Sequence, residues 1–503
     1  MTYRRNSIQP WYWRSLPLAK RTGSSVFATL FRPESDPEAI ATLLESPYPT
    51  PPDQPQLSRY SICAGTPRVV DGCLQMWTPP VGKILPFLNQ LIQVTTGVPT
   101  TPDELPFTGG WLGWLGYDMA WEIERLPYLK QDSLPFPVAY WYEPECFAVL
   151  DHSQQILWLA ATDPDQLDVL QSRLEKGDLG EGESGRVGEL LPSSYSALSP
   201  SLAPHFLTSQ EDYEASVRLA KKYIQAGDIF QANLSLRFEA HTAASSWKIY
   251  QALQQINPSP FASYWQTPWG AVISCSPERL VQLQRCRDGI QASTRPIAGT
   301  RSRGATREQD RHLAQDLLSN TKERAEHIML VDLERNDLGR VCQWGSINVN
   351  ELLTIERYSH VMHLVSNITG TLSSQYNAID LIRALFPGGT ITGCPKVRCM
   401  EIIENLELLR RNLFYGSCGY LDWRGYLDLN ILIRTLLFRR QESGDKGQKG
   451  EITNYNTPTS LNTVWGQVGA GIVADSDPER EWYESLHKAQ AQLAALKLGF
   501  RSC

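Results

Sequence analysis

Acidic side chains recur at one-turn spacing in two segments of this chain, and such a pattern of oxygen ligands suits a hard divalent cation. In KERAEHIMLVDLERNDL, Glu323 and Glu326 stand three residues apart, so a helix places both on one face. In PEREWYESLHKAQAQLAAL, Glu481, Glu484 and Lys488 follow one another at +3 and +4. Mg²⁺ binds through one or two carboxylates plus substrate oxygens. The two acidic faces are therefore candidate halves of one metal site; the alternative is a pair of solvated helix faces with Glu–Lys pairs.

An arginine and two histidines are further candidate binding groups. Arg434 lies inside the apolar stretch LNILIRTLLF, which we interpret as a strand, and a guanidinium there needs a partner. It either clamps a carboxylate of a ligand or forms a buried ion pair. His360 and His363 look like a metal-binding pair, but residues 358–369 have a strand pattern, and residues three apart on a strand face opposite ways. We expect only one of the two histidines to face a cavity.

Two glycine-containing motifs resemble nucleotide sites but lack the required context. GAGIVA at 469–474 matches a dinucleotide-binding skeleton, yet ADSDP follows it and Pro478 marks the next helix start. GTITGCPK at 389–396 lacks the ending of a phosphate loop. It is interpreted as a loop that enters the helix KVRCMEIIENLELL, whose first amides are able to hold an anion.

The elements that must position these groups are a mixture of helices and alternating polar–apolar strands. Apolar residues at helical spacing predict a helix in DYEASVRLAKKYIQ, before Gly227, and another from Ser319 to Asp337. Strands are expected at 271–275 and 347–350. Because helices and strands do not alternate strictly, the sequence predicts an α+β fold with antiparallel sheets rather than a doubly wound sheet.

Two loose stretches divide the chain. Residues 175–206, rich in Gly, Ser and Pro, are interpreted as a linker or exposed loop between an N-terminal region (1–174) and a C-terminal region (207–503). Residues 440–461 are interpreted as an exposed insertion.

Composition restricts the class of protein but not its chemistry. The 503 residues carry 47 basic and 54 acidic side chains, a formal net charge of −7, which argues against nucleic-acid binding through a basic field. We find no apolar run of about 18 residues and therefore expect no membrane span. Ten cysteines without a CxxC pair predict reduced thiols in a cytoplasmic protein. The alternative, import into a plastid, rests on the basic segment 1–5.

Several sequence blocks occur together in a recognisable order. They are LLES (43–46), RYSICAG (59–65), FTGGWLGWLGYDMAWEIERLP (107–127), TRPIAGTRSRG (294–304), ERAEHIMLVDLERNDLGR (323–340), YSHVMHLVS (358–366), FPGGTITGCPKVRCMEIIENLE (386–407) and GAGIVADSDPEREWYES (469–485). This set resembles the chorismate-utilising enzymes, the family that contains anthranilate synthase component I and aminodeoxychorismate synthase component I. The resemblance implies one α+β body in which large antiparallel β-sheets form a two-layer core flanked by helices.

The resemblance also implies a substrate and a metal. Chorismate is a ring with two carboxylates and a leaving hydroxyl, and the family binds it with Mg²⁺. Glu326 and Glu484 match the metal ligands, with Glu481 and Glu323 one turn away as supporting carboxylates. The metal is expected to neutralise one substrate carboxylate and to orient the ring.

The remaining family positions imply the residues around the ring. Glu278 resembles the general acid that protonates the departing hydroxyl, and His363 is expected beside the ring. The second carboxylate and the walls of the site are assigned to Arg434, Tyr415, the backbone of Gly469, Ala470 and Gly471, Lys488, Gly299, Thr300 and Thr390.

Ammonia, the expected nucleophile, has no source in this chain. A glutamine amidotransferase needs a cysteine in a GxCxG-like turn, and none of the ten cysteines has that setting; the nearest is Cys418 in GSCGY. The resemblance therefore implies a separate glutamine amidotransferase subunit as partner.

Two products remain open within the family. QANLS (231–235), SPER (276–279) and PGGTITG (387–393) look more like the aminodeoxychorismate branch, which we favour. Ala298, where some members carry a lysine, and an effector-site pattern favour the anthranilate branch. That pattern is LLES with Ser46 and NPSPF (257–261), and it resembles a tryptophan feedback site. Such a site would include Ser46, Pro260, Phe261 and position 262, where the family has methionine and this chain has Ala262. A third reading, a non-catalytic chorismate-binding subunit, conflicts with the presence of Glu278, Glu326 and Glu484.

Overall fold

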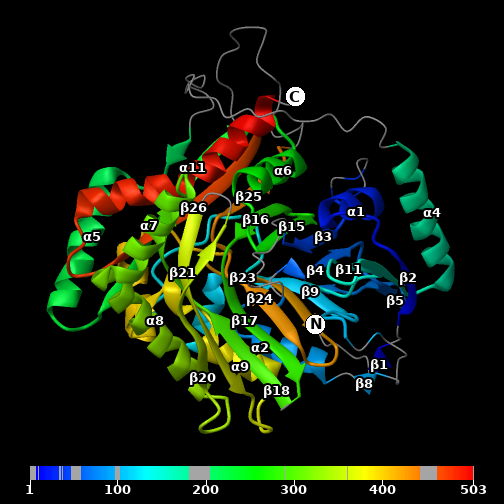
Figure 1. Ribbon diagram of the computed structural model, residues 1–503, viewed down its shortest axis with the longest axis horizontal. Coiled ribbons are helices and arrows are strands. Elements are labelled where there is room, and N and C mark those ends of the chain that lie inside the picture. The colour runs from blue at the N-terminus through cyan, green and yellow to red at the C-terminus, as the bar shows by residue number, and fades with distance from the viewer. Residues whose placement is uncertain are drawn as a thin grey trace.

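Two large antiparallel sheets make up the centre of the computed structural model, and helices cover them (Figure 1). The structure describes residues 7–8, 11–32, 36, 38–46, 58–93, 95–96, 102, 104–180, 204–287, 289–358, 361–441 and 461–501. The predicted α+β class with large antiparallel sheets is confirmed.

The first sheet has ten strands in the order β19-β21-β18-β17-β24-β23-β9-β10-β7, with β20 paired to β21. Its strands are β7 (Met76–Trp77), β9 (Gly110–Leu115), β10 (Ala139–Tyr142), β17 (Arg279–Cys286), β18 (Gly289–Arg295), β19 (Ile297–Ser302), β20 (Asn348–Arg357), β21 (Val361–Thr371), β23 (Ser417–Asp422) and β24 (Leu427–Asn430).

The second sheet has twelve strands in the order β13-β14-β26-β25-β16-β15-β3-β4-β11-β12-β2, with β22 paired to β14. Its strands are β2 (Tyr12–Pro17), β3 (Ala41–Glu45), β4 (Tyr60–Ala64), β11 (Cys146–Asp151), β12 (Ile156–Ala161), β13 (His205–Phe206), β14 (Gln231–Thr242), β15 (Phe261–Thr267), β16 (Gly270–Ser276), β22 (Gly393–Cys394), β25 (Thr435–Arg439) and β26 (Asn462–Ile472). Two small pairs lie outside the large sheets: β1 (Ser7–Ile8) with β8 (Thr95–Thr96), and β5 (Val69–Val70) with β6 (Cys73–Leu74).

Helices lie on the sheets, with α4 on the opposite side of the molecule from α5 and α8 (Figure 1). They are α1 (Gly23–Leu30), α2 (Ile84–Ile92), α3 (Ala120–Ile123), α4 (Pro164–Gly180), α5 (Gln210–Gln225), α6 (Ser246–Ile256), α7 (Arg307–Ser319), α8 (Thr321–Gly339), α9 (Ala378–Leu385), α10 (Lys396–Leu406) and α11 (Pro478–Arg501). The predicted helices near 319–337 and before Gly227 correspond to α8 and α5. Within the described part of the chain, no helix is long and apolar enough to cross a membrane.

The core between the sheets is built from large side chains that meet face to face. The rings of Trp114 on β9 and Trp265 on β15 lie 5.8 Å apart in an edge-on contact, and both are fully buried. Nearby, the hydroxyl of Tyr142 on β10 donates to Thr42 on β3 at 2.8 Å. Burial of aromatic surface of this size is a main source of folding free energy.

Two of the places at which the chain passes from one sheet to the other lie next to each other. Pro277 and Glu278 join β16 to β17, and residues 431–434 join β24 to β25. The prediction that Arg434 lies inside a strand is therefore wrong: it is the last residue of a crossover and has φ +51°. The apolar run that contains it spans two strands of different sheets, and only tertiary packing separates them.

The two sequence regions form one interlocked structure. β7, β9 and β10 from the N-terminal region complete the sheet of β23 and β24, and β3 pairs with β15. The predicted linker is shorter than 175–206, because α4 continues to Gly180 and His205–Phe206 form β13. The linker's centre, 181–203, and most of the predicted insertion, 442–460, lie outside the described residues.

We expect residues 204–503, expressed without residues 1–180, to be unfolded or aggregated. The fragment would lose the partners of β23 and β15 and expose the indole of Trp265. Circular dichroism and size-exclusion chromatography measure this, and co-expression of the two fragments should restore a soluble complex. A monomeric fragment that unfolds cooperatively on its own would contradict the interlocked description.

Candidate active site

Glu278 is a carboxyl group buried at the crossover between the two sheets. Only 4% of it is exposed, and the Ile297 amide donates to its Oε1 at 3.3 Å. Burial raises its pKa to about 8, against the opposing effects of the Thr390 hydroxyl and the Ile297 amide. Among nearby charges, Glu334 raises this pKa further and Arg434 lowers it. At neutral pH the group is a protonated acid that is able to donate a proton.

Arg434 lies beside Glu278 on the second crossover. Its Nη1 donates to Asn257 Oδ1 at 3.3 Å, and among the described residues no carboxylate forms an ion pair with it. Burial lowers its pKa, and nearby groups including Cys275, Tyr358 and Glu278 oppose that effect. Of the two predicted roles, a carboxylate clamp for a ligand fits this environment better than an internal ion pair.

His363 faces the same region from β21. It is 2% exposed, its Nδ1 lies 3.0 Å from Thr300 Oγ1 on β19, and its Nε2 has no hydrogen-bond partner. Burial, helped by the positive charge of Arg434, lowers its pKa to about 3, so the imidazole is neutral. A buried nitrogen without a partner is available to a ligand. The prediction that His363 faces inward agrees with this burial, and His360 lies outside the described residues.

Gly299 connects these groups to the helices that carry the predicted metal ligands. It has φ +66°, and a Cβ at this position would stand 2.8 Å from Glu323 Oε2. Glu323 forms an ion pair with Arg301 at 3.1 Å. Arg301 is therefore a further charged neighbour of the site, which the sequence analysis did not name.

Glu326 on α8 and Glu481 and Glu484 on α11 form one acidic group. Burial raises the pKa of Glu326, and the charge of Lys322 opposes this effect. The charges of Glu323, Glu481 and Glu484 raise the pKa further. Burial also raises the pKa of Glu481, which is 7% exposed. The two acidic faces predicted from their spacing therefore lie close enough for their charges to interact.

This donor set fits a hard divalent cation. The mutual repulsion of half-buried carboxylates is the kind of cost that a bound cation removes. No three His, Cys, Asp or Glu side chains in the described ranges converge tightly enough to hold an ion alone. Oxygens of a substrate would complete the coordination, as is common for Mg²⁺.

Lys488 joins the acidic group to the β26 backbone. Its Nζ lies 2.9 Å from Glu484 Oε1 and donates to the carbonyl of Gly469 at 3.1 Å. Burial alone would raise the pKa of Glu484, but the charge and hydrogen bond of Lys488, together with the charges of Lys322 and His487, outweigh burial and lower the pKa. Gly469, Ala470 and Gly471 pair with β14. A Cβ on Gly469 would meet the Leu234 carbonyl at 2.3 Å, so the strand tolerates only glycine there.

The predicted residues Tyr415 and Thr390 lie at the end of the site formed by β14. Tyr415, which precedes β23, is 5% exposed with φ +65°, and burial raises the pKa of its phenol. Thr390 belongs to a short 3-10 turn, Gly389–Ile391, and its carbonyl accepts from Asn233 Nδ2 at 3.2 Å. Hydrogen bonds and electrostatic interactions thus connect the acid, arginine, histidine and carboxylates predicted from sequence.

Sequence reasoning missed two groups of this site. Glu334 is a buried acid near Glu278, and Asn257 is the partner of Arg434. A signal for Glu334 was present, because it stands eleven residues, or three helical turns, after Glu323 on the same face of α8. No local signal marked Asn257, whose contact depends on the arrangement of the sheets.

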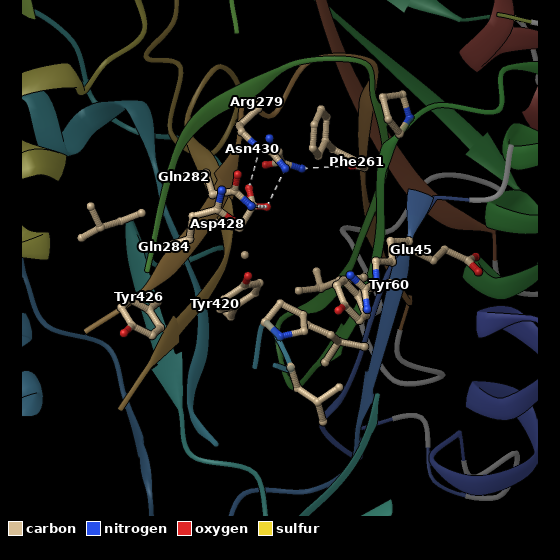
Figure 2. A pocket seen from close by; sticks show the side chains of 18 of the residues that line it. Glu45, Tyr60, Phe261, Arg279, Gln282, Gln284, Tyr420, Tyr426, Asp428 and Asn430 are labelled. Atoms are coloured by element: carbon tan, nitrogen blue, oxygen red, sulfur yellow. Dashed lines mark hydrogen bonds and ion pairs between the residues drawn. The ribbon is translucent and has the colours of Figure 1, made fainter. Parts of the chain in front are cut away.

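A separate cavity of about 420 Å³ lies between the sheets. Pro260, Phe261 and Ala262, three of the predicted effector residues, line it, whereas Ser46 is not among its lining residues. Figure 2 shows Arg279, Gln282 and Asp428 gathered on one wall, where Arg279 and Asp428 form an ion pair at 2.8 Å.

Glu45 belongs to the same predicted motif as Ser46, but its carboxylate points away from this cavity (Figure 2). It accepts hydrogen bonds from the hydroxyls of Ser24 and Tyr250 instead. The regulatory role of the cavity stays a prediction.

The chain is similar to known chorismate binding enzymes over most of its length. The family model for chorismate binding enzymes matches residues 75–494. An "anthranilate synthase component I-like protein" of Synechocystis sp. is 58% identical over 97% of this chain and 93% of its own length. Aminodeoxychorismate synthase component 1 of Bacillus subtilis is 44% identical over 79% of each chain. The crystal structure of anthranilate synthase component I from Streptococcus pneumoniae superposes with a TM-score of 0.68 at 30% identity, covering 87% of this chain and 92% of that one.

The raised pKa of Glu278 predicts a pH dependence of stability. A folded-state pKa of about 8, above the ordinary value of 4.5, means that the acid's contribution to stability is complete below pH 4.5 and is lost as the pH rises through 8. Between these limits the free energy of unfolding should fall by up to about 1.4 kcal/mol per pH unit because of this group. Glu278→Gln should remove that part of the slope in urea unfolding at several pH values. Equal slopes for variant and wild type would contradict the assignment.

Proposed function

The chain belongs to the chorismate binding enzyme family, and from this premise we propose that it aminates chorismate to 4-amino-4-deoxychorismate. The proposal is carried by two neighbouring groups. Glu278 is a buried, protonated acid, and Arg434 beside it forms no ion pair with a carboxylate among the described residues. These groups suit loss of a hydroxyl from a ring that carries carboxylates. The similarity to the Bacillus subtilis aminodeoxychorismate synthase component 1 supports this product.

Separate residues would bind the substrate and transfer the proton. Arg434 would hold one substrate carboxylate, and the neutral His363 would face the ring through Nε2. Ammonia forms the new bond from its nitrogen to the ring, and the ring's bond to the hydroxyl oxygen breaks. That oxygen takes the proton of Glu278 and leaves as water, while a proton of the bound ammonia returns to solvent or to the carboxylate. The enolpyruvyl group is retained.

Glu326 and Glu484 would hold Mg²⁺, with Glu481 in support. When bound, the ion supplies positive charge that neutralises a substrate carboxylate. Lys488 and Lys322 are the nearby cations, and Lys488 already pairs with Glu484. Because the protein carries a formal net charge of −7, local cations are what attract a dianionic substrate.

Ammonia would come from a separate glutamine amidotransferase subunit. The cysteine that such an activity needs has no candidate here: Cys418, the nearest by motif, is buried on β23 close to Ser263 Oγ at 3.4 Å, and burial raises its pKa. The names of the relatives as component I proteins support a two-component enzyme.

Anthranilate synthesis is the second candidate function. The similarity to the Synechocystis protein, whose name is anthranilate synthase component I-like, favours it, as does Ala298 on β19. The two reactions share addition of ammonia and loss of the hydroxyl. They differ in the ring position attacked and in whether pyruvate is expelled.

The product distinguishes the candidates. We expect the purified chain, given chorismate, Mg²⁺ and an ammonium salt at alkaline pH, to form a product that yields 4-aminobenzoate only after a lyase is added. Liquid chromatography with fluorescence detection separates 4-aminobenzoate from anthranilate. Direct appearance of anthranilate and pyruvate would support the second candidate instead, and no turnover would contradict both.

Glu484→Gln should weaken Mg²⁺ binding by roughly 10- to 100-fold and abolish Mg²⁺-dependent turnover, because it removes a charged oxygen ligand. Isothermal titration calorimetry with Mg²⁺ in the presence of chorismate and without an ammonium salt measures the affinity, and circular dichroism checks the fold. Glu479→Gln is the matched control, since Glu479 is exposed in the first turn of the same helix. An unchanged affinity in the Glu484 variant would refute the metal assignment.

A further inference from the structure

Glu334 is a second buried acid that the proposed reaction leaves without a role. It is 3% exposed on α8, the Thr294 hydroxyl donates to its Oε2 at 3.1 Å, and the Gly389 amide donates to its Oε1 at 3.4 Å. Burying a carboxylate costs free energy unless the group is protonated, hydrogen-bonded or paired with a cation. Its two hydrogen bonds keep it in place, and neither donor is charged.

The same two chain segments hold Glu334 and Glu278. In the first segment, Thr294 donates to Glu334 and Ile297 donates to Glu278. In the second, the Gly389 amide contacts Glu334, and the hydroxyl of the next residue, Thr390, lies beside Glu278. Contacts through neighbouring residues of both segments place the two acids on adjacent parts of one wall.

The charged groups around Glu334 and Glu278 do not cancel the repulsion between the two carboxylates. Asp337, on the same helix α8, faces Glu334. Lys396 approaches from α10, but the Nζ of Lys396 pairs with Asp337 at 2.5 Å and donates to the Leu385 carbonyl at 2.8 Å. No described lysine or arginine forms an ion pair with Glu334 itself. Burial and then Asp337 raise the pKa of Glu334, against the effects of Lys396, Thr294 and Gly389. Arg434 is the cation that faces Glu278.

We propose that Glu334 is a positioning residue whose negative charge keeps Glu278 protonated in the alkaline range where the enzyme uses ammonia. The inference rests on the proposed function, because it assigns Glu278 the proton-donating step. A like charge nearby disfavours ionisation of a carboxyl group. Ammonia attacks only as the free base, which increases with pH, whereas an acid catalyst is lost with rising pH. A neighbouring anion extends the pH range in which both forms are present.

The pH profile of turnover tests this role. In Glu334→Gln the alkaline limb of kcat/KM for ammonium-dependent turnover should move down by about one pH unit, while the turnover well below that limb changes less. Glu334→Asp, which retains the charge, should restore much of the profile. Glu404→Gln is the matched control, because Glu404 is equally buried but contacts Leu129 and Lys130 in another part of the fold. An alkaline limb that stays in place in Glu334→Gln would overturn the proposal.

A titration without turnover separates this inference from the function itself. Infrared difference spectra follow the protonated carboxyl band that Glu278→Gln removes. In Glu334→Gln that band should disappear at lower pH than in the wild-type chain. An unchanged midpoint overturns the role of Glu334 even if the enzyme is active, and a shifted midpoint upholds the interaction even if the chain makes neither product.

A second variant covers the case in which Glu334→Gln does not fold. Thr294→Val keeps the shape of the side chain but removes the hydroxyl that stabilises the Glu334 carboxylate. Glu334 should then ionise at higher pH, so the alkaline limb and the Glu278 band should shift in the same direction as in Glu334→Gln. A shift in the opposite direction, or none, would also overturn the proposal.

Discussion

The two adjacent crossovers that carry Glu278 and Arg434 are the constraint on which the site depends. A segment that leaves a sheet has backbone groups without ladder partners, and these must be satisfied elsewhere. Here the crossovers satisfy one another: Ile431 N donates to the Glu278 carbonyl at 3.0 Å, Ser276 Oγ donates to the Ile431 carbonyl at 2.6 Å, and Cys275 N donates to the Arg434 carbonyl at 3.3 Å. The acid and the guanidinium are consequently placed by backbone hydrogen bonds, which hold them more rigidly than a surface loop would.

Burial decides what each charged group in this region does. His363 and Glu278 are both neutral near pH 7, for the same reason: a low-dielectric wall disfavours the charged form of each. Arg434 retains a guanidinium there because its intrinsic pKa is so high. A site with one fixed cation, a neutral imidazole and a protonated acid suits an anionic substrate far better than the overall charge of −7 implies.

Periodicity predicted most of what is local in this structure. The common face of Glu323 and Glu326 on α8 and the start of α11 at Pro478 follow from residue spacing and from the position of a proline. The break at Arg434 could not be predicted in this way, because an apolar run shared by two sheets has the same pattern as one long strand. Partners distant in sequence, such as Asn257 for Arg434, depend on strand order, which no local pattern contains.

Helix α8 shows why residue type alone does not assign a role. Glu323 in its first turn is ion-paired with Arg301, Glu326 one turn later is half-buried among other carboxylates, and Glu334 is enclosed with hydrogen bonds from neutral donors. Glu323 and Glu326 are about equally exposed, whereas Glu334 is buried, so three identical side chains are a paired anion, a metal-ligand candidate and an enclosed carboxyl group. Because all three lie on one helix, a single element is able to present carboxyl groups in different environments to one substrate. Such separation of acidities by environment allows carboxylates to act as anions and as acids at the same pH.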